Sequence, residues 1–150
     1  MKLKAIVFDI DGVLLQTDFI LKEIEEKGLI GDAKWEYFYE HCNSDRVKTI
    51  PSMVKLYNTI QTSAYHYKMI LCTARNRDNY YALVNKLKQE MISFDFIYMR
   101  KSTDYRPDTE VKRDLLKQIM EEYDVIAFID DKEDNCQMAK ELGIFSLRVV

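Results

Sequence analysis

Five short runs of consecutive apolar residues constrain the fold of this 150-residue chain more than any other feature. Each run is rich in β-branched or aromatic residues, and longer amphipathic segments separate them. Strands that are apolar on consecutive positions are buried on both faces, which is typical of a parallel sheet. The chain is therefore predicted to form a five-stranded parallel sheet. The predicted strands are residues 3–8, 67–72, 94–99, 125–129 and 145–150.

Helical periodicity marks the segments between these runs. Apolar residues recur at three- and four-residue steps in 80–91 and 111–123, and another amphipathic segment follows Pro51. A last helix is predicted over 133–142, ending at Gly143 as a C-cap. Parallel neighbours need crossover connections, so this alternation predicts a doubly wound, Rossmann-like α/β fold.

Residues 16–50 interrupt the alternation. The segment is rich in charged and aromatic residues, with helical patterning over 18–28 and 34–41. Connections of this length are usually functional. We predict one domain, residues 1–150, with a small helical cap at about 16–50 inserted after the first strand. The aromatic side chains of this cap either pack within it or stack on a nucleobase.

Composition excludes several classes of protein. The net charge of −3 gives no global attraction to nucleic acid, and no stretch approaches the roughly 18 apolar residues of a membrane span. Three cysteines without CxxC spacing argue against a disulfide framework or a zinc site. We expect a cytoplasmic protein that does not bind membranes, and the sequence makes no prediction of oligomeric state.

Side chains capable of chemistry follow three of the predicted strands. The carboxyl ends of parallel strands face the same edge of a sheet, so these side chains should share one crevice. Carboxylates a few ångströms apart repel one another unless a cation or a proton joins them. The pattern therefore predicts a metal site, a catalytic site, or both. The residues are Asp9, Asp11, Thr73, Arg75, Asp130 and Asp131, with Lys112 on the helix before the fourth strand.

Four motifs, in this order, resemble those of the haloacid dehalogenase superfamily of phosphohydrolases. They are FDIDGVL, LCTAR, the VK of TEVKRDLL, and FIDDKEDN. The resemblance implies that Asp9 is the nucleophile and Asp11 the acid/base. It also implies that Thr73 and Lys112 bind the phosphate and that Asp130 binds a metal.

Magnesium suits this set of residues. Mg²⁺ prefers oxygen ligands and needs only one or two carboxylates, which fits Asp9, Asp130 and the backbone carbonyl of Asp11. Asp131 or Asp134 would supply the second acid of the metal site. Asp9 would attack phosphorus and form an aspartyl-phosphate, while Asp11 would protonate the leaving oxygen and then deprotonate water.

A narrower resemblance involves the stretch MRKSTDYRPDTEVKRDLL, together with LCTAR and the paired acids of FIDD. It is similar to the 3′-phosphatase domain of phage-type polynucleotide kinase-phosphatases. This implies that Arg75, Arg106 and Asp108 bind substrate beside Thr73 and Lys112, and that the substrate is a phosphorylated nucleic-acid 3′ end.

Three other functions remain open on the sequence. The stretch between the first two motifs is longer than expected for that domain, and 5′(3′)-deoxynucleotidases of the same superfamily also carry a helical cap there. A small-molecule phosphatase is a second alternative. A receiver-like signalling module is less favoured, because its phosphorylated aspartate follows the third strand, whereas here that strand ends in Met99 and Arg100.

Overall fold

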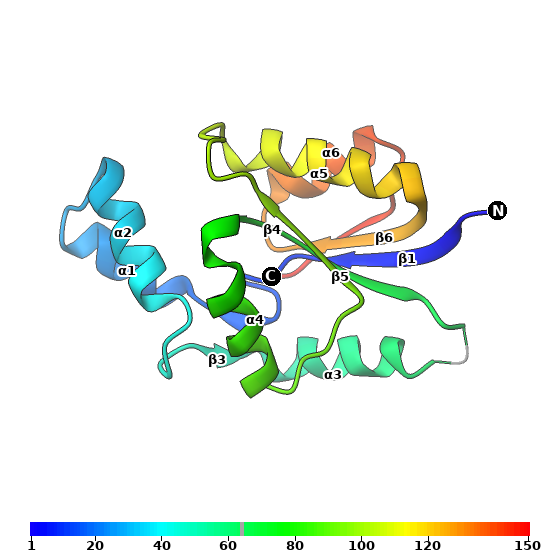
Figure 1. Ribbon diagram of the computed structural model, residues 1–150, viewed down its shortest axis with the longest axis horizontal. Helices are drawn as coiled ribbons and strands as arrows, with labels where there is room; N and C mark the ends of the chain where they lie inside the picture. The colour runs from blue at the N-terminus through cyan, green and yellow to red at the C-terminus, as the bar shows by residue number, and fades with distance from the viewer. Residues whose placement is uncertain (64) are drawn as a thin grey trace.

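Five parallel strands form the central sheet of the protein, in the order β5-β4-β1-β6-β7 (Figure 1). The computed structural model describes residues 1–63 and 65–150. β1 occupies the centre and pairs with β4 on one side and β6 on the other. The predicted five-stranded parallel α/β sheet is therefore confirmed. The strands are β1 (Leu3–Phe8), β4 (Lys68–Asn76), β5 (Phe96–Arg100), β6 (Tyr123–Asp130) and β7 (Ser146–Arg148).

Helices cover both faces of the sheet. α5 (Asp108–Glu122) and α6 (Glu133–Glu141) lie on one face, and α3 (Pro51–Gln61) and α4 (Tyr80–Gln89) lie on the other (Figure 1). A short 3₁₀ helix, η1 (Arg77–Asn79), precedes α4. Successive side chains of a strand point to opposite faces, so β1 contributes to two separate hydrophobic clusters, one on each face of the sheet.

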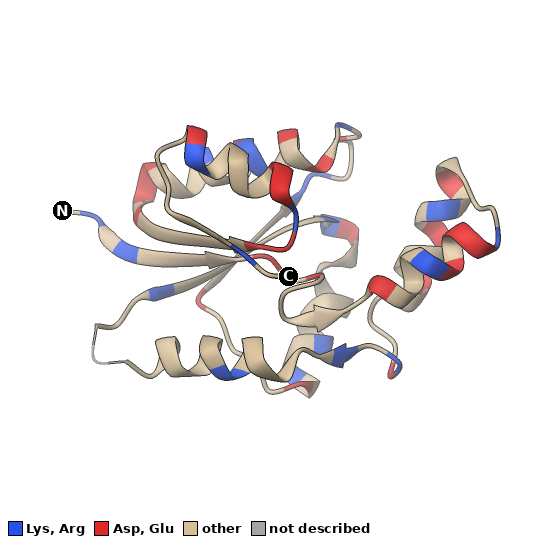
Figure 2. Cartoon of the chain, turned by 180° about the vertical axis from the view of Figure 1, so that it is seen from behind, with Lys and Arg blue, Asp and Glu red and all other residues tan. Residues whose placement is uncertain are grey.

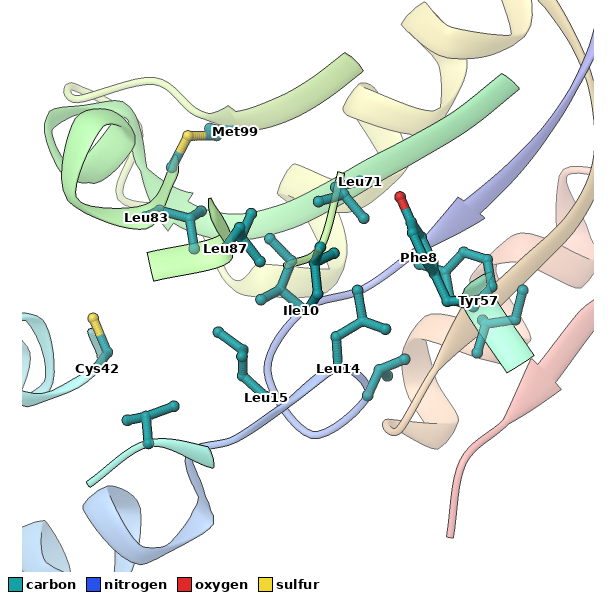
Figure 3. Close-up of a cluster of buried hydrophobic side chains, with 14 of the residues drawn as sticks. Phe8, Ile10, Leu14, Leu15, Cys42, Tyr57, Leu71, Leu83, Leu87 and Met99 are labelled. Carbon is teal, nitrogen blue, oxygen red and sulfur yellow. The ribbon is translucent and has the colours of Figure 1, made fainter. Parts of the chain in front are cut away.

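The cluster on the α3/α4 face fixes the position of α3. Figure 3 shows Phe8 of β1 beside Tyr57 of α3, with Leu83 and Leu87 of α4 in the same cluster. The rings of Phe8 and Tyr57 meet edge to face with centroids 5.0 Å apart. The buried Tyr57 hydroxyl donates to the Ser93 carbonyl at 2.7 Å, which satisfies its only polar atom.

Two further helices lie within residues 16–50 and project to one side of the sheet (Figures 1 and 2). They are α1 (Asp18–Glu26) and α2 (Gly31–His41), and they contact each other. The chain enters and leaves the pair through two short antiparallel strands, β2 (Leu15–Gln16) and β3 (Lys48–Thr49), which the sequence analysis did not predict. Residues 16–50, which include this helix pair, are called the cap below.

Three strands extend beyond their predicted ends, and all three extensions bear on the site. β5 ends at Arg100, one residue past its predicted end. β4 continues past Cys72 to Asn76, with a register irregularity before Asn76 pairs with Arg100. β6 ends at Asp130 itself, one residue past its predicted end. Within the described residues, none of the helices is long and apolar enough to span a bilayer.

Candidate active site

A cleft of about 950 Å³ lies between the carboxyl end of the sheet and the cap. The side chains predicted from the sequence to act together converge there. Asp130 is fully buried just beneath the lining. The predicted residues that line the cleft are Asp9, Asp11, Thr73, Arg75, Arg106, Asp108, Lys112 and Asp131.

Three carboxylates form the floor of the cleft. Asp9, Asp130 and Asp131 each place an oxygen within 4.8 Å of the others. Asp9 and Asp130 are buried, whereas Asp131 is half-buried. Asp134 lies in the first turn of α6 and does not belong to this group. Of the two acids that the sequence left open, Asp131 is therefore the one that lies beside Asp9 and Asp130.

Gly12 makes room for Asp131. Its backbone φ is +79°, a left-handed conformation that side chains rarely adopt. A Cβ atom at this position would lie 2.2 Å from Asp131 Oδ2, so only glycine allows the carboxylate to approach. The other oxygen, Asp131 Oδ1, is buried and has no hydrogen-bond partner among the described residues. An oxygen in this state suits a cation.

The ammonium group of Lys112 lies between two of the acids. Nζ is 2.9 Å from Asp9 Oδ1 and 2.7 Å from Asp130 Oδ2. Burial alone would lower the pKa of Lys112, but the charges of the two carboxylates outweigh it and raise that pKa above its ordinary value. Lys112 therefore stays positively charged in the floor of the cleft.

One ammonium does not balance three carboxylates. Burial, and then the neighbouring charges of Asp130 and Asp11, raise the pKa of Asp9 well above its ordinary value, although Lys112 opposes them. A divalent cation would supply the missing charge and keep Asp9 ionised. Hard carboxylate oxygens, one of them without a partner, fit Mg²⁺.

Asn135 also holds the floor of the cleft, and the sequence analysis missed it. Its Nδ2 donates to Asp130 Oδ2 at 3.1 Å, and the backbone N–H of Lys132 donates to Asp130 Oδ1 at 2.9 Å. Thr109 of α5 in turn donates its hydroxyl to Asn135 Oδ1 at 2.7 Å. The available signal was the place of Asn135 in the first helical turn after the paired acids.

Asp11 lies outside the group of three carboxylates and pairs with Arg75. Arg75 Nε and Nη2 donate to its two oxygens at 2.9 and 2.6 Å. Burial would raise the pKa of the Asp11 carboxyl, but Arg75 outweighs burial and holds that pKa below its ordinary value. Asp11 is therefore ionised while the pair is intact, with its side chain 25% exposed to the cleft.

Thr73 lies in β4, the strand next to the central β1. Its side chain is buried and belongs to the lining of the cleft. Its oxygen accepts a hydrogen bond from the backbone N–H of Arg75 at 3.1 Å. The hydroxyl hydrogen can then point toward a phosphoryl oxygen. A phosphate bound between Asp9 and Asp11 would have Thr73 and Lys112 beside it.

The loop before α5 forms one wall of the cleft and is held by Arg100, another residue that the sequence analysis missed. Arg100 donates to the carbonyls of Ala74 at 2.8 Å, Asp104 at 3.1 Å and Arg106 at 2.5 Å, and to the Asp108 carboxylate at 2.7 Å. The Arg100 side chain therefore stabilises the conformation of this loop.

Arg106 and Asp108 lie on this wall, but both have partners within the protein. Arg106 pairs with Asp104 and Asp114, each at 2.8 Å. Asp108 pairs with Lys132 at 3.3 Å as well as with Arg100. Arg106 has about half of its side chain exposed and would have to leave these acids to grip a phosphate.

The opposite wall belongs to the cap and combines aromatic and acidic side chains. Trp35, Phe38 and Tyr39 line the cleft from α2, and Trp35 is 45% exposed. The remaining cap residues of this wall are Thr17, Asp18, Leu21, Asp32 and Glu36. A phosphate bound at the floor would therefore place its leaving group between an aromatic, acidic wall and the loop before α5.

A family model described as the phosphatase domain of polynucleotide kinase PNKP matches residues 3–150. A comparison with curated protein sequences gave no match. Among solved structures, two neighbours are titled as Pnkp1/Rnl/Hen1 complexes, the second as an RNA repair complex. They are 24% and 23% identical to the chain, with TM-scores of 0.76 and 0.77.

These likenesses cover almost all of this chain but less than half of the neighbours. The matches span 97% and 99% of this chain and 45% and 42% of those chains. A haloacid dehalogenase-like hydrolase from Streptococcus pneumoniae is 16% identical, with a TM-score of 0.71, and covers 99% of this chain and 85% of its own. At these identities, the structural neighbours establish the fold.

Proposed function

The chain belongs to the family of polynucleotide kinase PNKP phosphatase domains and is a phosphatase of the haloacid dehalogenase type, and on this premise we propose that it is a Mg²⁺-dependent phosphomonoesterase that removes the phosphate from a nucleic-acid 3′ end. The observation that carries the proposal is the convergence of Asp9, Asp11, Thr73 and Lys112 in one cleft. Asp130 and Asp131 complete the set as metal ligands beside Asp9.

Asp9 is proposed as the nucleophile. Its carboxylate oxygen forms a bond to phosphorus, and the bond from phosphorus to the leaving oxygen breaks, which leaves a phosphoryl group on Asp9. Lys112, 2.9 Å from Asp9, and the Thr73 hydroxyl bind the phosphoryl oxygens and offset their negative charge. Mg²⁺, held by Asp9, Asp130 and Asp131, would supply further positive charge at these oxygens.

Asp11 is proposed to move the protons. Asp11 is ionised in the resting site, so its carboxylate first takes up a proton from solvent through the cleft. Its carboxyl then gives that proton to the leaving oxygen as the electron pair of the broken bond arrives there. In the second step the Asp11 carboxylate takes a proton from water as the water oxygen bonds to phosphorus, and the bond to Asp9 breaks. Inorganic phosphate leaves, and Asp9 returns as a carboxylate. Pairing with Arg75 favours the ionised form that this second step needs.

The cleft suits recognition of a terminal phosphate with few contacts to the rest of a strand. Its five cationic side chains, Arg75, Arg100, Arg106, Lys112 and Lys132, each contact a carboxylate of the protein. Phosphates further along a strand would therefore find little free positive charge. We expect the rate to depend on the terminal nucleoside and only weakly on strand length. One structural neighbour is titled as an RNA repair complex, so a 3′-phosphorylated RNA is the first substrate to test.

A free nucleotide is the second candidate substrate. The aromatic side chains of α2 in the cleft, with Trp35 the most accessible, could stack on the base of a nucleoside monophosphate. This arrangement would suit a 5′(3′)-deoxynucleotidase as well.

One comparison separates these substrates. With Mg²⁺ at fixed salt, kcat/KM is measured on a 3′-phosphorylated RNA or DNA oligonucleotide, on nucleoside 3′- and 5′-monophosphates, and on glycerol 2-phosphate. The proposal predicts the highest value on the 3′-phosphorylated end. A higher kcat/KM on nucleoside 5′-monophosphates would contradict the proposal and indicate a nucleotidase.

The nucleophile is checked with Asp9→Asn, which keeps the size of the side chain but removes the attacking oxygen anion. Activity should fall by at least about 10⁴-fold, and rapid acid quench of the parent enzyme should trap phosphate on the protein. Full activity of Asp9→Asn would contradict the assignment.

A further inference from the structure

We propose that Asn43 is a positioning residue for Asp11 and acts through the guanidinium of Arg75, so that the way the cap sits on the core sets the direction of the acid/base carboxylate. The inference rests on the proposed function, in which Asp11 transfers the proton. The three residues come from different parts of the fold. Asn43 follows the cap helix α2, Asp11 follows the central strand β1, and Arg75 lies in β4.

All five hydrogens of the Arg75 guanidinium have acceptors within the protein. Two bind the oxygens of Asp11 as described above. The second hydrogen of Nη2 points to the Cys42 carbonyl at 3.3 Å. Nη1 donates to Asn43 Oδ1 at 2.8 Å and to Asn79 Oδ1 at 3.4 Å. In this arrangement Arg75 has no hydrogen left for phosphate, so it acts on the reaction through Asp11.

The cap supplies several of the groups that surround the Arg75 guanidinium. Phe38 of α2 lies under the guanidinium, 5.7 Å from its centre, and Cys42 and Asn43 follow directly where the helix ends. Asn43 is itself held in place, because its Nδ2 donates to Asn79 Oδ1 at 3.2 Å. The acceptor that holds Nη1 most closely is therefore a fixed amide from the cap.

Rigidity of the guanidinium carries this constraint to the active site. The group is planar, so holding Nη1 sets the direction of the Nε and Nη2 edge that binds Asp11. A lone pair of Asp11 that Arg75 does not occupy can carry the proton that passes to the leaving oxygen in the cleft. Without Asn43, Nη1 would keep only the 3.4 Å contact to Asn79, and the Arg75 and Asp11 pair could turn together.

This role predicts a loss that depends on the leaving group. An alcohol oxygen needs a proton as it departs, whereas p-nitrophenolate leaves without one. Lys112 and Thr73, which are assigned to phosphate, do not contact Asn43 by hydrogen bond or ion pair in the described structure. A misdirected Asp11 should therefore slow release of an alcohol and leave p-nitrophenol release and substrate binding almost unchanged.

The experiment measures the first-turnover rate of Asn43→Ala with Mg²⁺ on two substrates, p-nitrophenyl phosphate and the best alkyl phosphate ester of the panel above. We expect about a tenfold loss on the alkyl ester, a fraction of the 10²- to 10⁴-fold that a general acid contributes. The loss on p-nitrophenyl phosphate should be below about twofold, and so should the change in KM.

The matched control is Gln16→Ala. Gln16 donates to the Thr49 carbonyl at 3.1 Å where the cap joins the core, and it contacts neither Arg75 nor the cleft. This variant loses one side-chain hydrogen bond at the base of the cap, and it should match the parent on both substrates. Thermal unfolding and near-ultraviolet circular dichroism of each variant report whether the fold is kept.

Several outcomes overturn the inference. Equal losses on the two substrates would show a structural effect, and unchanged rates on both would show that Asn43 does not act on Asp11. If Asn43→Ala does not fold, Asn79→Ala removes the partner of the same amide and must show the same substrate dependence, at about threefold. A parent protein with no phosphatase activity on any ester would remove the proposed function and the inference with it.

Discussion

Gly12→Ala should weaken metal binding as well as the fold. The new methyl group would lie 2.2 Å from Asp131 Oδ2, whereas ordinary carbon–oxygen contacts are longer by about 1 Å or more. Because the clash is with the end of a half-buried side chain, Asp131 can swing aside. That movement takes one of the three carboxylates out of the proposed Mg²⁺ site.

The two parts of the effect can be estimated separately. A non-glycine residue at φ +79° costs about 1–2 kcal/mol, which lowers the melting temperature of a chain this long by about 2–8 °C. Displacing a group that orients a metal site costs about tenfold or more in affinity. At 100 times the parent Kd, Mg²⁺ stabilises the parent by about 2.7 kcal/mol; a tenfold weaker site reduces this to about 1.4 kcal/mol.

Gly143→Ala is the matched control. Gly143 has φ +82°, nearly the same backbone conformation, but nothing lies within 4 Å of a Cβ atom added there. Both variants should lose similar stability without metal. In a Mg²⁺ titration followed by thermal unfolding, only Gly12→Ala should gain less than the parent. If the two variants gain equally from Mg²⁺, Asp131 is not the ligand that Gly12 accommodates.

Two further predictions concern the buried charges and the buried thiols: one uses a variant and the other uses labelling of the parent protein. Lys112→Met leaves Asp9 and Asp130 without their shared cation and should destabilise the metal-free protein at pH 7 by about 3–5 kcal/mol in urea unfolding. Because burial raises the folded-state pKa of Asp9, protonation below that pKa should shrink the deficit as the pH falls toward 5; a deficit that does not change with pH would contradict this. Burial raises the pKa of Cys42 to about 11 and that of Cys72 to about 12, so both thiols should react slowly with DTNB at pH 8 and at once in guanidinium chloride; rapid labelling of the folded protein would refute it.

Apolar runs predicted the sheet because they indicate which residues are buried. They do not indicate where the hydrogen bonding between strands ends. The run in β4 ends at Cys72, yet the strand pairs with β5 beyond it, and its polar continuation through Thr73 carries side chains to the cleft. The paired strands β2 and β3 have two residues each, which is too short for any periodicity to show.

The acids of the site could be predicted because each follows a strand that meets the same sheet edge. The partners that direct them could not. Arg75 was predicted in the cleft as a substrate-binding residue, but its contact with Asn43 joins residues 32 positions apart through a single hydrogen bond. Arg100 looked like the plain end of a strand, and only the folded loop gives it four acceptors.

The central place of β1 has a consequence for the order of folding. Asp9 and Asp130 lie about 120 residues apart in the sequence, so the pairing of β1 with β6 closes a long loop and carries a large entropic cost. Until this pairing forms, the carboxylates stay apart and hydrated, so their repulsion does not oppose the earlier steps of folding. We expect the cluster of acids to assemble late, when this long-range pairing closes, so recovery of phosphatase activity should report a late step of refolding.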